Sequence, residues 1–200
     1  MRHVALHAAI GLLVPVSVLA SNLVENADFD TDLSSWVIGG EGGTSVWYGA
    51  DGSPTAGSAR LTAGYGDLAY LTQCVLLPST LASSIDFSAD VYMFGDTMNN
   101  GTGTGTGYVL FVQSFAGTSC SDEVSYVTNE MNLPVPSAWT RVSHNFFPLP
   151  AGYQSALINI EVGGSSFNYT DFAFDHFYMN QVTDRIFGSD FEDPNPYVTE

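Results

Sequence analysis

Three aspartates alternate with other residues near the start of the chain, at Asp28, Asp30 and Asp32. Carboxylate oxygens are ligands that Ca²⁺ prefers, and the ion takes about six to eight oxygens. The loop is not an EF-hand, because Leu33 stands where that loop needs glycine and Gly39 where it needs its closing glutamate. The acidic loop therefore indicates either a cation site of another kind or a set of solvated turn residues.

A second group of side chains has the chemistry that neutral sugars require, namely exposed aromatic rings beside amides or carboxylates. Strand alternation should point one of Trp47 and Tyr48 outward, and Tyr92 shares the polar side of its strand with Ser88 and Asp90. We expect these rings to share an outer face with polar residues of other strands. The predicted ligand-binding residues are Trp47, Tyr48, Tyr92, Gln113, Asn159 and Glu161. A set of ordinary surface aromatics is the alternative interpretation.

Catalysis has less support in these residue types. A glycosidase needs two carboxylates across a cleft. The sequence contains enough carboxylates for such a pair, but it does not show that any two of them lie across a cleft. The available carboxylates are those of Asp90, Glu123, Glu130 and Glu161. His144 and His176, which a nucleophilic triad would require, both fit structural roles better. We therefore predict no catalytic residues, with a glycoside-active enzyme that uses paired carboxylates as the alternative.

The charge balance excludes several classes of partner. The chain has no lysine, and 4 basic residues face 21 acidic ones, so the formal net charge is −17. Nucleic acids and anionic membranes need Lys and Arg to neutralise phosphate, and neither is an expected partner. Acidic polysaccharides are disfavoured for the same reason, unless Ca²⁺ bridges them.

Residues 1–20 have the features of a secretory signal peptide. Arg2 precedes a long apolar run, and Val18 and Ala20 occupy the small-residue positions that a signal peptidase needs. We expect the rest of the chain to be secreted, periplasmic or on the cell surface, without membrane insertion after cleavage. An uncleaved anchor is the alternative.

Two cysteines, Cys74 and Cys120, are present. In an exported chain they pair most simply into one disulfide, which by the loop-entropy estimate is worth about 3–4 kcal/mol. A zinc or redox role is not expected, because there is no neighbouring histidine and no Cys-x-x-Cys spacing.

Short alternating segments separated by Gly- and Pro-rich turns predict strands throughout the chain. Phe87, Ala89 and Val91 share one face of a strand, while the intervening residues share the other. The predicted strands are an opening one at 22–24 and then 44–48, 58–62, 68–76, 85–94, 108–115, 123–128, 140–147, 156–162 and 172–179. The pattern predicts an all-β antiparallel jelly-roll β-sandwich over residues 21–179 and an acidic C-terminal tail over 180–200.

Motifs spread over most of the chain support the same fold. They are Asn22-Leu23-Val24 with Asn26, Phe29, Asp30, Leu33 and Trp36; Ala56-Gly57-Ser58-Ala59-Arg60-Leu61; Leu71 and Gln73; Phe87-Ser88-Ala89-Asp90-Val91; Trp139-Thr140-Arg141-Val142; Pro150-Ala151-Gly152; and Phe174-Asp175-His176-Phe177. In this order the chain resembles the carbohydrate-binding modules of the galactose-binding-like jelly-roll superfamily, in particular those related to cellulose- and xylan-binding modules.

The resemblance implies a structural Ca²⁺ where the first loop meets the last strand. By position, Asp30 takes the acidic place of the family and Asp175 the first place of its Asp-Asp pair, whereas His176 replaces the second acid. With Asp28 added from the acidic loop, the expected metal ligands are Asp28, Asp30 and Asp175. The resemblance also places Trp36 and Trp139 in the core.

As a whole, the resemblance implies a secreted, non-catalytic protein that binds neutral glycans by aromatic stacking. The expected partner is a carbohydrate or polysaccharide. Such modules usually direct an attached enzyme, and none follows the predicted domain, so we also expect association with a separate enzyme or with the cell surface. Besides the glycoside-active enzyme, a second alternative to a glycan-binding protein is a surface or adhesion module with no glycan ligand.

Overall fold

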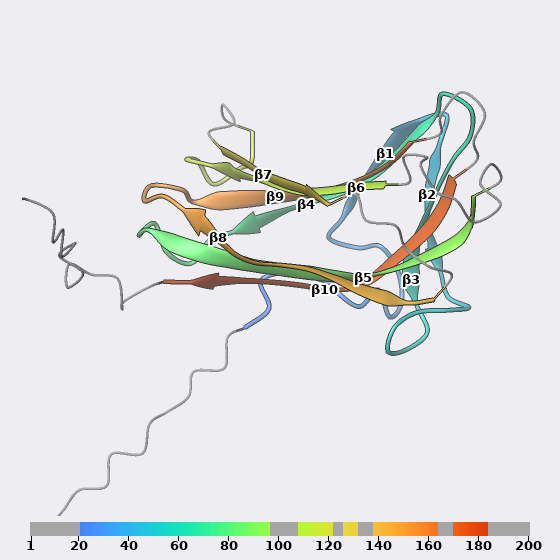
Figure 1. The fold of residues 1–200 in the computed structure, drawn as a ribbon, viewed down its shortest axis with the longest axis horizontal. Helices are drawn as coiled ribbons and strands as arrows, with labels where there is room; N and C mark the ends of the chain where they lie inside the picture. Colours follow the sequence, from blue (N-terminus) through green and yellow to red (C-terminus); the bar gives the residue numbers. More distant parts are fainter. Residues whose placement is uncertain (1–20, 97–107, 122–125, 132–137, 164–169, 184–200) are drawn as a thin grey trace, which may run out of the picture.

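Two antiparallel sheets form the molecule. The computed structural model describes residues 21–96, 108–121, 126–131, 138–163 and 170–183, and every regular element in these ranges is a strand. The first sheet contains, in spatial order, β1 (Val37–Glu41), β4 (Leu68–Leu76), β9 (Ser155–Gly163), β6 (Tyr108–Phe115) and β7 (Tyr126–Met131). The second contains β2 (Thr44–Tyr48), β3 (Ser58–Ala63), β10 (Thr170–Val182), β5 (Ser83–Asp96) and β8 (Thr140–Leu149). The layered sheets in Figure 1 confirm the predicted all-β jelly-roll sandwich.

The core lies between the two sheets and follows the alternation of the strands. On β9, Ile158 and Ile160 are fully buried, and on β5 Phe87 and Val91 are at most 2% exposed. Each such aliphatic or aromatic side chain contributes about 1.5–3 kcal/mol relative to an exposed one. The same alternation turns the intervening residues outward, so each sheet presents one outer face.

The segment that precedes β1 lies along β10 and extends the second sheet (Figure 1). The N–H of Leu23 donates to the carbonyl of Met179 (2.9 Å), and the N–H of Phe177 donates to that of Ala27 (3.0 Å). The Asn22 side chain donates to the carbonyl of Phe177 (2.7 Å) and accepts from the N–H of Met179 (3.0 Å). The start of the described chain and its last strand are thus held side by side.

Most observed strands begin and end within three residues of the predicted bounds, and three differences are larger or bear on the site. Residues 22–24 bind β10 but do not form the predicted opening strand, whereas Val37–Glu41, which is not among the predicted strands, forms edge strand β1. Strand β10 continues to Val182, beyond residue 179, where the tail was expected to begin. Near the end of β10 the buried side chain is polar: Gln181 is 8% exposed and forms hydrogen bonds with the main chain of Ser79. A search for alternating apolar residues therefore does not detect the end of this strand.

The predicted signal peptide and most of the predicted tail lie outside the described residues, as does Glu123. Among the residues that are described, no helix is long and apolar enough to cross a membrane.

Candidate functional site

The outer face of the first sheet is built from the central strands β4, β9 and β6. Cross-strand register places its outward side chains in rows that run across the sheet. One row contains Thr72, Asn159 and Phe111, and the next contains Tyr70, Glu161 and Val109. We call these two rows the first-sheet face. It combines aromatic rings, an amide and a carboxylate on three neighbouring strands.

Asn159 is the most unusual member of the first-sheet face. It points away from the core on the central strand, yet it is only 9% exposed. Its Nδ2 donates to Oε1 of Glu161 (2.8 Å), whereas its Oδ1 is buried and has no hydrogen-bond partner within the described residues. An unsatisfied buried acceptor costs about 1–3 kcal/mol. A hydrogen-bond donor that reached this oxygen would recover this energy.

The outer face of the second sheet carries a ladder of aromatic rings. Tyr48 contacts Phe94 edge-on (5.3 Å between ring centroids), Phe94 contacts Tyr92 (4.9 Å), and Tyr92 contacts Trp139 (5.5 Å). The guanidinium of Arg60 lies 4.4 Å from the Phe94 ring centroid and 5.1 Å from that of Tyr48. Phe94 was missed as a candidate, although it continues the outward alternation of Tyr92.

The charged groups on this second face are paired with one another. Arg60 donates two bonds to Asp171, at 2.8 and 2.5 Å. Arg141 donates to Asp90 (3.0 Å), to the Ser88 hydroxyl (2.6 Å) and to the carbonyl of His176 (2.6 Å). The two arginines of the second face, Arg60 and Arg141, are therefore engaged within the protein.

The tryptophans divide differently from the prediction. Trp36 is 7% exposed and packs on Phe29 and Phe177, which confirms its place in the core. Trp139 does not lie in the core: it is half-buried on the outer face of the second sheet, and its Nε1 donates to Asp51 (3.3 Å). It was misassigned because its packing partner, Tyr92, is itself an outward residue of another strand.

Trp47 and Tyr48 lie on opposite sides of the edge strand β2, as alternation requires. Tyr48 joins the aromatic ladder, whereas Trp47 pairs with the buried Ala59 and is 43% exposed. The Trp47 Nε1 donates to the carbonyl of Phe29 (2.7 Å). The indole therefore covers the end of the acidic loop and its only hydrogen-bond donor is used there.

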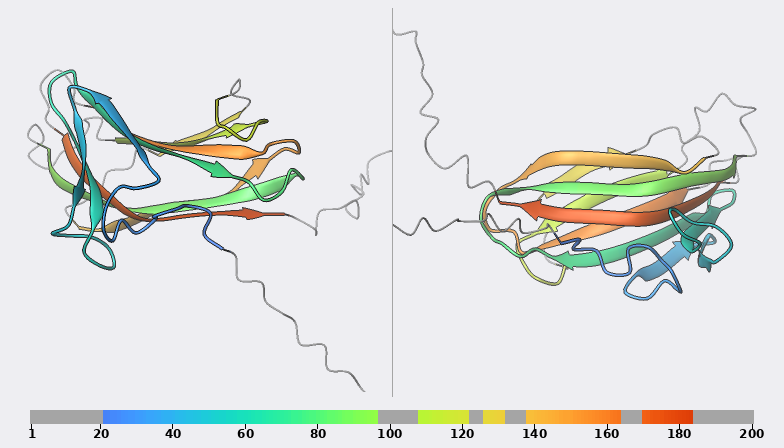
Figure 2. Two further views of the ribbon diagram at one scale, coloured as in Figure 1. Left: turned by 180° about the vertical axis from the view of Figure 1, so that it is seen from behind. Right: turned by 90° about the horizontal axis from the view of Figure 1, so that it is seen from below.

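The structure does not bring the six predicted ligand-binding residues onto one face. Tyr48 and Tyr92 lie on the outer face of the second sheet, and Gln113, Asn159 and Glu161 lie on the outer face of the first. The expectation of a shared face is wrong, because the two sheets turn their outer faces in opposite directions (Figure 2, left).

Asp175 is a buried carboxylate beside a bulge of β10. It is 1% exposed; its Oδ2 accepts the N–H of Ser53 (2.6 Å) and its Oδ1 accepts the N–H of His176 (2.7 Å). Burial, together with the charges of Asp28 and Asp90, raises the pKa of Asp175 to about 7 against the lowering effect of these two hydrogen bonds. Among the described residues, no positive charge contributes to compensating the ionised carboxylate.

Carbonyl oxygens gather next to the Asp175 carboxylate. A Cβ on Gly52 would lie 2.9 Å from Asp175 Oδ2 and would collide with the carbonyl oxygens of Thr55 and Gly57. The Thr55 hydroxyl donates to Oδ1 of Asp30 (3.2 Å), so Asp30 adjoins the same loop. This donor set of one buried carboxylate and main-chain carbonyls fits a hard cation such as Ca²⁺.

The other acidic residues contribute less to such a site. Asp28 and Asp30 are exposed, and within the described residues no group of three or more His, Cys, Asp or Glu side chains could hold a metal by itself. Asp32 organises the turn instead: its Oδ1 accepts the N–H of Ser34 (2.8 Å), and hydrogen bonds from Ser34 lower the pKa of Asp32.

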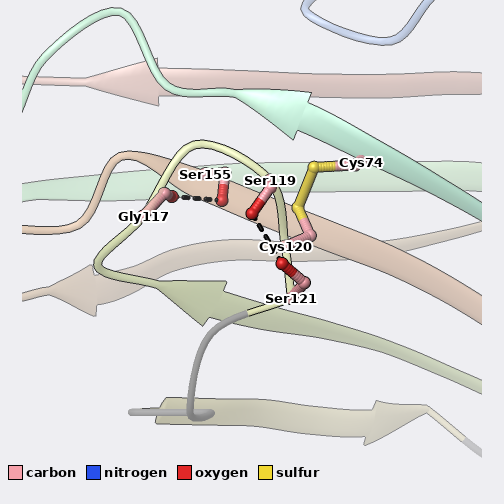
Figure 3. Close-up of a disulfide and its surroundings, with 6 residues drawn as sticks. All are labelled: Cys74, Gly117, Ser119, Cys120, Ser121 and Ser155. Atoms are coloured by element: carbon pink, nitrogen blue, oxygen red, sulfur yellow. Dashed lines mark hydrogen bonds between the residues drawn. A yellow bond between two sulfur atoms is a disulfide. The ribbon is translucent and has the colours of Figure 1, made fainter.

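Cys74 and Cys120 form the predicted disulfide, with their Cα atoms 5.9 Å apart (Figure 3). Cys74 is exposed on the outward side of β4, and Cys120 belongs to the segment that follows β6. The bridge therefore lies on the same side of the first sheet as Asn159.

The fold is a β-sandwich of the kind found in carbohydrate-binding modules. The solved module described as Family 16 Carbohydrate Binding Module-2 matches with a TM-score of 0.57 and 17% identity, over 79% of this chain and 99% of that one. TmCBM61, solved in complex with β-1,4-galactotriose, matches with a TM-score of 0.53 and 16% identity, over 80% and 98% of the two chains.

A third similar structure is the enzymatically active domain of tailspike protein 4 from bacteriophage CBA120. Its TM-score is 0.59 at 15% identity over 80% of this chain, and the match spans 21% of that chain. At these identities the likeness shows a shared fold. No protein-family model matches the chain, and no curated protein matches it in sequence.

Proposed function

We propose that this protein is a secreted glycan-binding module that holds a neutral carbohydrate on its first-sheet face. The observation that carries the proposal is the buried Oδ1 of Asn159, next to Glu161, which has no hydrogen-bond partner among the described residues. Amide and carboxylate groups bind sugar hydroxyls. Phe111 is directly opposite Asn159, and Tyr70 is directly opposite Glu161 with its ring over Gly39 of β1. Both rings are half-buried and offer apolar surface to the C–H faces of a sugar. The resemblance in fold to carbohydrate-binding modules supports the same assignment.

A difference between the two outer faces supports the first-sheet face as the binding site. On the second sheet, Arg60 pairs with Asp171 and Arg141 pairs with Asp90, so a ligand there would have to replace existing interactions. On the first-sheet face, a ligand hydroxyl would satisfy an acceptor that has no partner in the part of the chain that the structure describes. A hydrogen bond to a buried unpaired acceptor is favourable, because it removes the free-energy cost of leaving that acceptor without a donor.

We further propose that the protein binds its ligand without cleaving it. Asp90 and Asp175 both bind Ser53, which brings two carboxylates together, but they are only 9% and 1% exposed. A glycosidase needs its two carboxyl groups on either side of a bound glycosidic bond. The Glu161 carboxylate accepts a hydrogen bond from Asn159, so it is better suited to hold a ligand than to transfer a proton.

A structural Ca²⁺ held by Asp175, with the carbonyl oxygens of Thr55 and Gly57 and with Asp30 nearby, completes the proposal. The ion would supply the positive charge that the buried carboxylate lacks. Because these groups join the acidic loop, the 51–57 loop and β10, the ion would tie three segments of the chain together.

The test of the binding face compares three variants by calorimetric titration with a panel of soluble β-1,4-linked oligosaccharides. We expect Asn159→Ala and Tyr70→Ala each to weaken binding about tenfold or more, since each removes about 1.4 kcal/mol or more of contact energy. Tyr92→Ala is the matched control, because it removes a half-buried tyrosine from the opposite sheet.

The control also tests the alternative site. If Tyr92→Ala abolishes binding while Tyr70→Ala does not, the glycan binds the aromatic ladder of the second sheet instead. Release of reducing sugar by the wild type would contradict the non-catalytic assignment.

A further inference from the structure

The segment that follows β6 folds back over the outer side of the first sheet. Residues 116–121 begin beside the start of β9, where Gln154 Nε2 donates to the carbonyl of Ala116 (2.5 Å) and the Ser155 hydroxyl donates to that of Gly117 (2.6 Å). Near the other end of the segment, Cys120 is bonded to Cys74 on β4. Strand β9 lies between β6 and β4, so the segment crosses β9 to reach Cys74 (Figure 3).

Register defines where this crossing lies relative to the first-sheet face. Cys74 is directly opposite Leu157 of β9, and Leu157 is directly opposite Gln113 of β6. Asn159 is two residues further along β9, a distance of about 7 Å. The segment 116–121 therefore runs across the strands, parallel to the row of Asn159 and one row away from it.

We propose that the disulfide-pinned segment 116–121 is the specificity element of this binding face. It forms a ridge along one side of the face, so that a single glycan chain lying across the strands contacts both the ridge and the row of Asn159. The flat surface of a packed polysaccharide would be held away from the row by the same ridge. This inference rests on the proposed glycan binding. It adds that the ligand is a soluble, single glycan chain and not the surface of a packed polysaccharide.

The bridge is the contact that fixes the far end of the ridge. At the near end, residues 116 and 117 are held by Gln154 and Ser155, whereas Ser119 and Ser121 bond each other and are exposed. Without the bridge, residues 118–121 would have to be ordered on binding, which costs about 0.5–1.5 kcal/mol for each immobilised side chain. The affinity for a glycan should therefore depend on the bridge.

The experiment measures binding of soluble β-1,4-linked gluco-, xylo- and galacto-oligosaccharides by calorimetry, and retention on insoluble cellulose by sedimentation. We expect the wild type to bind a soluble oligosaccharide in preference to cellulose. The Cys74→Ser/Cys120→Ser variant should bind the same oligosaccharide about tenfold more weakly, while its circular dichroism remains that of the folded sandwich.

A second variant keeps the bridge and loosens the near end of the ridge. Gln154→Ala/Ser155→Ala removes the two anchoring hydrogen bonds and should also weaken binding several-fold, and it decides the question if the serine variant does not fold. Either folded variant binding like the wild type would overturn the role of the ridge, as would a wild type that is retained on cellulose and binds no soluble oligosaccharide. A wild type that binds neither would instead refute the proposed function itself.

Discussion

Asp175 and Asn159 are both buried polar residues, but they differ in what they lack. Asp175 has a hydrogen bond to each carboxylate oxygen and lacks a compensating charge. Asn159 has a partner for its amino group and, within the described residues, none for its carbonyl. The first deficit suits a cation and the second suits a neutral hydroxyl donor, which is why we assign them to different ligands.

The raised pKa of Asp175 makes the stability of the protein without Ca²⁺ depend on pH. Because the folded-state pKa of about 7 exceeds the ordinary value of 3.8, the stability contribution is complete below about pH 4 and is lost as pH rises through about 7. We expect the melting temperature in chelator to fall from pH 5 to pH 8. Added Ca²⁺ should restore more of it at pH 8 than at pH 5, because the ion binds the ionised carboxylate.

Asp175→Asn is the matched variant for this measurement. It should lose most of the decline between pH 5 and 8 and most of the response to Ca²⁺, although the amide can accept only one of the two N–H donors properly and will lower stability throughout. An unchanged decline in the Asn variant would show that another group is responsible, and identical melting in Ca²⁺ and in chelator would remove the cation from the site.

At the scale of elements, β10 organises the second sheet. It pairs with β3 and β5, and at its bulge between Asp175 and Tyr178 it turns the Asp175 carboxylate toward the 51–57 loop. His176, in the bulge, has a positive φ of 48°. Beyond the bulge, the segment that contains Asn22 occupies the edge of β10 that β3 leaves open. The last strand thus connects the start of the chain with the proposed cation site.

Asn22→Ala tests this connection. The variant removes two side-chain bonds to the main chain of β10, at 2.7 and 3.0 Å, and should lower the free energy of unfolding by about 1–2 kcal/mol. The measurement is urea unfolding followed by tryptophan fluorescence, since Trp36 lies in the core next to Phe177. Glu25→Ala is the control, because Glu25 lies on the same segment, is exposed like Asn22, and binds Gln73 through its main chain. A cost as large as that of Asn22→Ala would indicate a general effect of the segment.

On the scale of the whole molecule, the disulfide joins positions that are 46 residues apart in the sequence. A covalent link of this span reduces the conformational freedom of the unfolded chain. It also connects β4 to the segment after β6 across the intervening strand β9, so it acts within the first sheet and not between the sheets.

Reduction should therefore lower global stability by about 3–4 kcal/mol on the chain-entropy estimate. We expect the midpoint of urea unfolding to fall on treatment with a reductant, with little change in the slope against urea. The Cys74→Ser/Cys120→Ser variant should show the lower midpoint with or without reductant. A reductant effect on that variant would mean that the loss does not come from the bridge.

Local pattern was enough to predict much of this protein. Alternation in β5 and β9 identified the core residues Phe87, Val91, Ile158 and Ile160, and the two cysteines identified their own bridge. These predictions succeed because a strand has a period of two residues, which is visible within a few positions. Edge strand β1 was missed in part because its glycines, Gly39 and Gly40, are typical of turns.

What the sequence could not provide is the sheet to which each strand belongs. Tyr92 and Asn159 both occupy polar positions of alternating strands, and on that ground alone they were placed on one face. The tertiary structure puts β5 and β9 in different sheets, so these residues point to opposite sides of the molecule. Alternation determines which side chains leave the core, but long-range strand pairing determines which of them meet.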